Sequence, residues 1–212
     1  METEERRVTD RRRLRGDRTR HAILSHGARL ASAEGLEAVS LQRLASDLGI
    51  SKSGLFAHFG SKEELQLAIV DEAARIFADE VLRPGLAPAR GVGRVLALCE
   101  AFLSYVERGV FPGGCFFEAT TAEFDSKPGA VRDAILERNA YWSATVVRVI
   151  RQAQEAGEID AGVDAEQLGW ELDCLLAGAN DSHAVDAGPV ALDRARRAIR
   201  RWLEAVSVGR GG

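Results

Sequence analysis

The residues best suited to contact another molecule gather between positions 40 and 62. Lysine, serine and histidine side chains donate hydrogen bonds to phosphate oxygens or base edges, and a phenylalanine can pack on a sugar or a thymine methyl group. Small residues among them would let a helix approach a groove closely. The candidates for such contacts are Ser40, Ser51, Lys52, Ser53, Gly54, Phe56, Ala57, His58 and Lys62. Core packing of Phe56 and helix capping by His58 are the competing interpretations.

Other chemistries lack the residues they need. The sequence has no Gly-rich phosphate loop, no nucleophile elbow and no His/Asp/Glu cluster with metal-ligand spacing. Its four histidines are scattered along the chain. We therefore expect a protein that is not an enzyme, with no cofactor and no metal site.

Two short helices are expected to position the candidate contacts. Ser40 is a plausible N-cap for the first, and Gly49 would end it. Ser51 can cap the second, with Leu55 and Phe59 facing inward at a spacing of one turn. Two such helices joined by a tight Gly-containing turn are typical of the helix-turn-helix, whose second helix lies in the major groove of DNA.

Longer helices are expected on both sides of this pair. An apolar face repeats from Thr19 to Ala33, and Gly35 would end that helix. Ser61 and Glu64 have the spacing of a capping box, which predicts the start of a long helix reaching about Leu82. Because a helix N-terminus favours anions, Lys62 beside it suits a DNA phosphate.

Charge is unevenly distributed along the 212 residues. The net charge is −4, yet the segment from Arg6 to Arg29 holds nine arginines against two aspartates. We interpret residues 1–17 as a disordered basic arm, an interpretation compatible with an arm that contacts DNA.

The stretch "SLQRLASDLGISKSGLFAHFGSKEELQLAIV" resembles the DNA-binding region of the TetR/AcrR family of bacterial repressors. It departs from the family pattern at Phe56, usually Tyr, and at Gly54, often Thr. We therefore expect this helix to make few direct contacts with base edges. We hypothesise that specificity depends on Lys52, Ser53, the arginine-rich arm and DNA shape.

The periodicity and the resemblance together predict an all-α fold. It comprises an N-terminal three-helix helix-turn-helix DNA-binding domain and a C-terminal helical ligand-binding and dimerisation domain. The expected divisions are a basic arm at 1–17, the DNA-binding domain at 18–64, a connecting helix at 65–82 and the effector-binding and dimerisation domain at 83–212. The Pro- and Gly-containing stretch 83–93 is interpreted as a linker.

The resemblance implies a small-molecule effector pocket whose occupation moves the connecting helix. Apolar and aromatic residues of the C-terminal domain are the candidates for its lining, with an amide and a carboxylate as polar anchors. They are Phe102, Tyr105, Cys115, Phe116, Asn139, Trp142, Trp170 and Asp173. Ordinary core packing is the alternative for each aromatic residue.

The last two predicted helices, at 164–183 and 190–206, each carry an apolar stripe. Resemblance implies that they form a homodimer, and a helix-turn-helix dimer must set its recognition helices roughly 34–36 Å apart. The candidate interface residues are Leu168, Leu172, Leu175, Leu176, Leu192, Ala195, Ile199 and Trp202. Burial in the core of the monomer is the competing interpretation.

The predicted function is a DNA-binding transcriptional regulator, a repressor released from operator DNA by a small hydrophobic effector. Two alternatives remain open: a redox sensor using Cys115 or Cys174, and a helical small-molecule binding protein without DNA binding. Whether the regulator represses or activates depends on where its operator lies. The three cysteines are expected to be buried thiols. Without an apolar span or leader, we expect a cytoplasmic protein with no membrane partner.

Overall fold

The computed structural model describes residues 2–51, 55, 59–186 and 188–208, with side-chain contacts given from Thr19 onward. Among these residues every extended regular element is a helix, and a lone antiparallel bridge joins Ile159 to Ser207. The predicted all-α fold is confirmed. The helices are α1 (Glu2–Glu34), α2 (Leu41–Leu48), α4 (Lys62–Phe77), the π-helix η1 (Ala78–Leu82), α5 (Arg83–Leu86), α6 (Val92–Glu107), α7 (Phe116–Phe124), α8 (Ala130–Glu155), α9 (Ala165–Asp186) and α10 (Val190–Val206).

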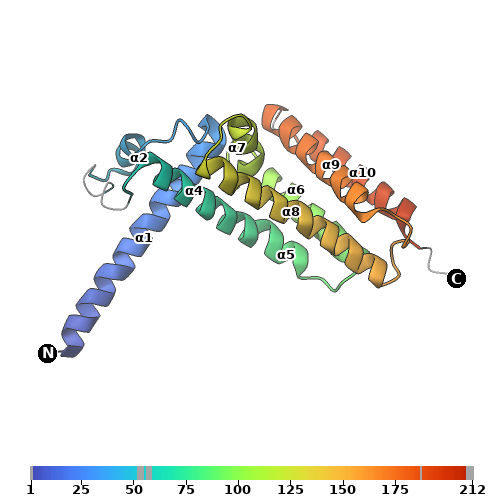
Figure 1. Ribbon diagram of the computed structural model, residues 1–212, viewed down its shortest axis with the longest axis horizontal. Helices are drawn as coiled ribbons and strands as arrows, with labels where there is room; N and C mark the ends of the chain where they lie inside the picture. The colour runs from blue at the N-terminus through green and yellow to red at the C-terminus, as the bar shows by residue number, and fades with distance from the viewer. Residues whose placement is uncertain (1, 52–54, 56–58, 187, 209–212) are drawn as a thin grey trace.

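The N-terminal body is built on the second half of α1. α2 and the start of α4 pack against it, whereas the first half of α1 projects away from the rest of the molecule (Figure 1). Gly27 allows the close approach of α4, because an added Cβ would lie 2.8 Å from Ile69 Cδ1. The apolar face of α1 predicted from the sequence is therefore the face that α4 covers.

The basic segment differs from its expectation. Residues 2–17, predicted to be a disordered arm, continue α1 as helix. Arginine, glutamate and leucine are all good helix formers, and Gly16 is the sole Gly or Pro among these residues. The prediction gave too much weight to low hydrophobicity and too little to helix propensity.

The connecting helix is longer than expected. α4, η1 and α5 follow one another without a break from Lys62 to Leu86, so residues 83–86 of the predicted linker are helical. Pro84 lies in the first turn of α5. Because α5 continues η1 without a break, Pro84 lies inside the continuous helix, where its missing N–H leaves a carbonyl of the preceding turn without that donor. The irregular connection begins only at Ala87.

The C-terminal body is a bundle of long helices. α8 packs on α4, α9 packs on α8 and α6, and α10 packs on α9 and α6. The short helix α7 lies between α1 and α8, and α9 and α10 lie at the end of the molecule far from the N-terminus (Figure 1). Leu98, Leu103, Ile135 and Ile150 are fully buried at its centre. Within the described ranges, none of the helices combines the length and apolar composition needed to cross a bilayer.

Candidate DNA interface and effector site

The scaffold of the helix-turn-helix matches its sequence pattern. The Ser40 hydroxyl accepts a hydrogen bond from the Arg43 N–H, and Gly49 ends α2 with a φ of 64°, in the left-handed region. Leu55 and Phe59 are both buried, and the Leu55 N–H donates to the Ser51 carbonyl at 3.1 Å. The predicted caps of α2 and the inward pair are thus in place, whereas the Ser51 cap stays a prediction.

Most of the predicted DNA contacts lie outside the described residues. They are Lys52, Ser53, Gly54, Phe56, Ala57 and His58. Of the described members, Ser40 caps the start of α2, Lys62 begins α4, and Ser51 lies directly before that segment. Their proposed contacts with DNA stay predictions.

Lys62 already has a partner within the protein. Its Nζ donates to the Glu37 carbonyl at 2.8 Å and to the Glu37 carboxylate at 3.1 Å. Hydrogen bonds from Lys62 and then from Gln66 lower the pKa of Glu37. Ser61 caps α4 through the Glu64 N–H, and the Glu64 carboxylate reaches back to the Gly60 N–H. A phosphate at this terminus would therefore compete with Glu37 for the Lys62 ammonium.

Aromatic side chains from four helices meet in the C-terminal body. Phe77, at the end of α4, lies against the rings of Phe102 of α6, Tyr105 of α6, Phe117 of α7 and Trp142 of α8 at centroid distances of 5.3–6.3 Å. We call these five residues the aromatic cluster. Three of its members, Phe102, Tyr105 and Trp142, were predicted to line an effector pocket, whereas Phe77 and Phe117 were not. The cluster attaches the connecting helix to the C-terminal body.

The remaining effector candidates are divided among different places. Cys115 and Phe116 are buried beside Tyr105, whose hydroxyl accepts from the Phe116 N–H at 3.5 Å. Asn139 donates to the Thr121 hydroxyl. Trp170 does not belong to this region: its side chain is 65% exposed, so its assignment to an internal pocket is wrong. Trp170 is two residues from both Leu168 and Leu172, so it lies on nearly the opposite side of α9 from these buried residues.

Two carboxylates lie half-buried at the edge of the aromatic cluster. Asp173 of α9 accepts a hydrogen bond from Trp142 Nε1 at 2.6 Å. Burial raises the pKa of Asp173, although that hydrogen bond opposes the shift. Burial, followed by the negative charges of Asp173 and Asp181, raises the pKa of Glu118 of α7 to about 7. The sequence analysis did not identify Glu118. An acidic residue in the first turn of a helix is already explained by its favourable interaction with the helix dipole.

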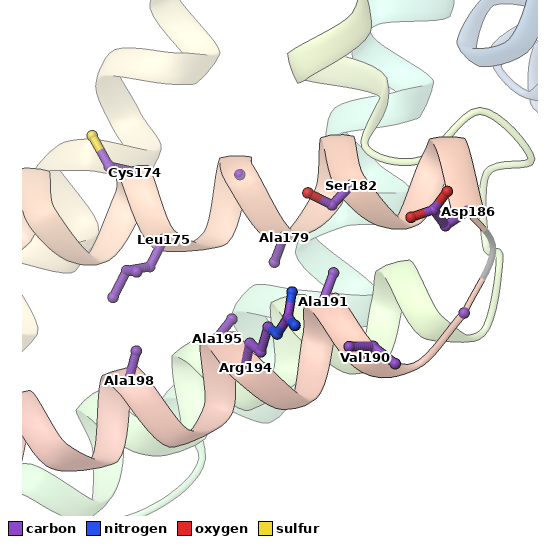
Figure 2. A pocket seen from close by; sticks show the side chains of 12 residues that line it. Cys174, Leu175, Ala179, Ser182, Asp186, Val190, Ala191, Arg194, Ala195 and Ala198 are labelled. Atoms are coloured by element: carbon purple, nitrogen blue, oxygen red, sulfur yellow. The ribbon is translucent and has the colours of Figure 1, made fainter.

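The α9 and α10 stripes are mostly core. Leu168, Leu172, Leu176, Leu192, Ala195 and Ile199 are buried within the protomer, so the monomer-core interpretation holds for them. Leu175 and Trp202 remain partly exposed. A groove of about 470 Å³ runs between the two helices on their outer side, lined by Cys174, Gly178, Arg194 and Ala198 among others. Figure 2 shows Arg194 extending into the space between α9 and α10.

The cysteines also differ from expectation. Cys99 and Cys115 are buried as predicted, but Cys174 is exposed at the groove. Burial raises the pKa of both Cys99 and Cys115 to about 12. Because the thiolate is the reactive form, neither buried thiol suits a redox sensor. Of the two cysteines named in the redox alternative, only Cys174 remains a candidate.

Comparison with known proteins assigns this chain to a family. Residues 23–69 match the family described as bacterial regulatory proteins of the tetR family. Residues 91–199 match the tetracyclin repressor-like C-terminal domain, and this second match spans half of the chain. The chain belongs to the TetR family. It is a TetR-family DNA-binding transcriptional regulator, as predicted, and TetR regulators are not enzymes.

Individual TetR proteins align over nearly the whole chain. The HTH-type transcriptional repressor ComR of Escherichia coli (strain K12) is 27% identical over 189 residues, which cover 88% of this chain and 90% of ComR. A TetR regulator from Chloroflexus aurantiacus superposes with a TM-score of 0.84 and 26% identity, covering 91% of this chain and 98% of that one. A regulator from Saccharomonospora viridis, solved in complex with choline, has a TM-score of 0.73 and 22% identity, covering 92% and 100%.

Proposed function

We propose that the protein is a repressor that leaves its operator when a small hydrophobic cation binds at the aromatic cluster. The observation that carries the proposal is the position of Phe77. It lies on the connecting helix and packs against rings of three effector-domain helices. A ligand that inserts among these rings must separate Phe77 from at least one partner, and α4 must then move.

Movement of α4 would reach the DNA-binding domain directly. The start of α4 packs on α1 at the close approach of Gly27 and Ile69. Glu72 of α4 accepts hydrogen bonds from Ser25 of α1 at 2.7 Å and from Arg75. α4 and the second half of α1 are therefore expected to move together, which changes the spacing of the recognition helices in a dimer.

The two half-buried carboxylates favour a positively charged effector. Among the described residues, neither Glu118 nor Asp173 forms an ion pair with a basic side chain. Buried charges are normally paired, and aromatic faces attract organic cations. An effector with an ammonium group would satisfy both features. The choline complex of the Saccharomonospora viridis regulator supports such a ligand in this fold.

The outer face of α9 and α10 is the proposed dimer surface. Gly178 has no neighbouring atom within 4 Å of an added Cβ, and Trp170 and Val190 are exposed apolar residues on the same two helices. Small side chains let helices of two protomers approach closely, and exposed apolar side chains gain most from being covered. Leu175 and Trp202 remain interface candidates at its edge.

The test begins with selection of an operator from a random duplex library by the purified protein. Binding should resist competitor DNA and weaken steeply with salt. Choline and dimethylbutanol, its neutral carbon analogue, are then titrated into the complex, followed by a series of larger quaternary ammonium ions with matched neutral analogues. Release by cations alone supports the proposal. Release by the neutral compounds alone would contradict the charge assignment, and failure to select any operator would contradict the regulator.

A repressor is distinguished from an activator by transcription in vitro. A promoter that carries the selected operator should be silenced by the protein and restored by the effector. An oxidant should leave operator binding unchanged in this proposal. Loss of binding with oxidant, restored by a thiol reductant and absent in Cys174→Ser, would favour the redox alternative instead.

A further inference from the structure

Glu123, at the end of α7, holds the turn between α1 and α2. Its Oε2 accepts a hydrogen bond from the Leu36 N–H at 2.7 Å, and its Oε1 accepts from the Glu37 N–H at 2.9 Å. The turn belongs to the DNA-binding domain and α7 to the effector domain. One carboxylate therefore binds two consecutive amides across the boundary between domains, in a charge-assisted geometry.

The turn is shaped around this carboxylate. Gly35, which precedes the two amides, has a φ of 90° and leaves room for the approach of Glu123. An added Cβ at Gly35 would lie 3.1 Å from Glu123 Oε1. A side chain there would meet both backbone strain and the carboxylate.

The loop before α7 is attached to the same end of α1. Arg29 Nη1 donates to the Val110 carbonyl at 2.6 Å, and the Gly113 N–H donates to the Ser32 hydroxyl at 3.3 Å. Contact is so close that a Cβ on Gly113 would lie 1.8 Å from the Ser32 carbonyl oxygen. The end of α1 thus rests on residues 110–113 as well as on α7.

The start of α7 is fixed from the opposite side. Asn180 of α9, which is buried, accepts a hydrogen bond from the Cys115 N–H at 2.7 Å. Glu118, three residues further along the chain, directly follows Phe117 of the aromatic cluster. A helix of nine residues therefore extends from the effector domain to the α1–α2 turn.

We propose that Glu123 is a positioning residue for operator binding, which orients the DNA-binding domain against the effector domain through the α1–α2 turn. The connecting helix α4 contacts the same turn through different groups: Lys62 donates to the Glu37 carbonyl and Gln66 to the Leu36 carbonyl, whereas Glu123 accepts from the two amides. Its role in operator binding rests on the proposed function, whereas its role in domain orientation does not. A ligand at Glu118 would displace α7 and, through it, the turn.

The decisive variant is Glu123→Gln. A glutamine has the same shape but one acceptor oxygen, so its amide NH₂ would face one of the two N–H donors. Glu123→Asp keeps the charge and shortens the side chain by one methylene, which also breaks the paired contact. Glu137→Gln, at an exposed position of α8, is the matched control for charge removal.

Domain orientation is measured by pulsed electron spin resonance within one protomer. Spin labels are attached at Gln42→Cys of α2 and Glu155→Cys of α8, both exposed, in a Cys174→Ser background and diluted with unlabelled protein. We expect a broader or shifted distance distribution for Glu123→Gln and Glu123→Asp, and the wild-type distribution for Glu137→Gln. Faster exchange of the Leu36 amide should accompany the change.

Operator affinity is the second measurement, with an operator selected by the wild-type protein. We expect both Glu123 variants to bind it roughly tenfold more weakly, which corresponds to about 1.4 kcal/mol. An unchanged distance distribution, despite faster exchange at Leu36, would overturn the proposal. So would a lowered melting temperature with unchanged operator affinity, because a merely stabilising contact behaves that way. If the wild type selects no operator, the proposed function fails, and the distances still decide whether Glu123 orients the domain.

Discussion

Phe77 of α4 and Trp142 of α8 meet edge to face, with ring centroids 5.3 Å apart and ring planes at 89°. Trp142 also donates its indole N–H to Asp173 of α9. The end of the connecting helix is thus joined through one indole to a carboxylate on the proposed dimer helix. Any ligand that displaces the indole alters both contacts at once.

Replacing Phe77 with leucine should uncouple effector binding from operator release. The smaller side chain leaves a cavity and loses the edge-to-face contacts, so the free energy of unfolding should fall by about 1–3 kcal/mol. Urea denaturation and operator titration with and without effector measure the two effects. Phe111→Leu, a buried ring that contacts Tyr105 and Phe116 instead, is the control. An equal loss of effector response in both variants would remove the special role of Phe77.

Glu118 should make the protein less stable as the pH rises. Burial and the neighbouring acidic residues raise the pKa of its folded-state carboxyl to about 7 from the usual 4.5. The folded state then binds a proton that the unfolded state has lost, so this stabilisation is complete below pH 4.5 and disappears as the pH passes 7. Glu118→Gln should flatten this slope and, at pH 8, be more stable by roughly 2 kcal/mol. Urea unfolding at several pH values measures this dependence of the unfolding free energy on pH. A wild-type slope in Glu118→Gln would contradict the raised pKa of Glu118.

The Glu72 network should respond to pH in the opposite direction. Burial alone would raise the pKa of Glu72, but hydrogen bonds from Arg75 and Ser25 outweigh it and the pKa is lowered. The stabilisation is therefore present above the usual carboxyl pKa and is lost as the pH falls through the lowered value. Glu72→Gln should cost about 1–3 kcal/mol at neutral pH and progressively less in acid. A constant difference at every pH would show that lost packing, rather than lost charge, explains the effect.

Thiol reactivity should single out Cys174. It is exposed, whereas Cys99 and Cys115 are buried and their pKa values are raised to about 12. One equivalent of a thiol reagent should react with the native protein, and none with Cys174→Ser. Because Cys174 lies in the groove between α9 and α10, the reaction should slow as the protein concentration increases and dimers form. A rate independent of concentration would place the dimer surface elsewhere.

Gly178 offers a sharper test of that surface. Gly178→Ala should be tolerated or slightly stabilising, because the position is open and alanine gains up to about 1 kcal/mol in a helix interior. Gly178→Arg adds a long charged side chain at the same open position. We expect it to fold with a wild-type circular dichroism spectrum but to sediment as a monomer and to lose operator binding. Dimers of Gly178→Arg would refute the proposed interface.

The local signals in the sequence predicted the scaffold well. Ser40, Gly49 and Ser61 cap helices as expected, because a cap depends on residues within one turn of itself. Leu55 and Phe59 face inward for the same reason, since a helical period needs no tertiary information. The helix predictions were wrong at residues 2–17 and 83–86. In both segments the composition favoured an irregular structure, but the residues form a helix.

The site residues were less predictable, because tertiary contacts decide their roles. Trp170 and Trp142 are similar in a sequence, yet one is exposed on α9 and the other lies in the aromatic cluster. Glu118 and Glu123 occur within "FFEATTAEF", where helical spacing explains both without indicating a partner. The partners of Glu123 lie more than eighty positions earlier in the chain. Sequence periodicity alone does not report such a contact.

The π-helix η1 determines which side of the connecting helix faces the bundle. Phe77, Val81 and Gly85 are all buried, at a spacing of four residues. In a regular α-helix, with about 100° per residue, the third would be rotated by roughly 80° from the first. The wider turn of a π-helix removes much of this drift. The three residues can therefore stay in phase along one line, and a return of η1 to α-helical winding would turn Gly85 away from Leu98 of α6, against which it packs.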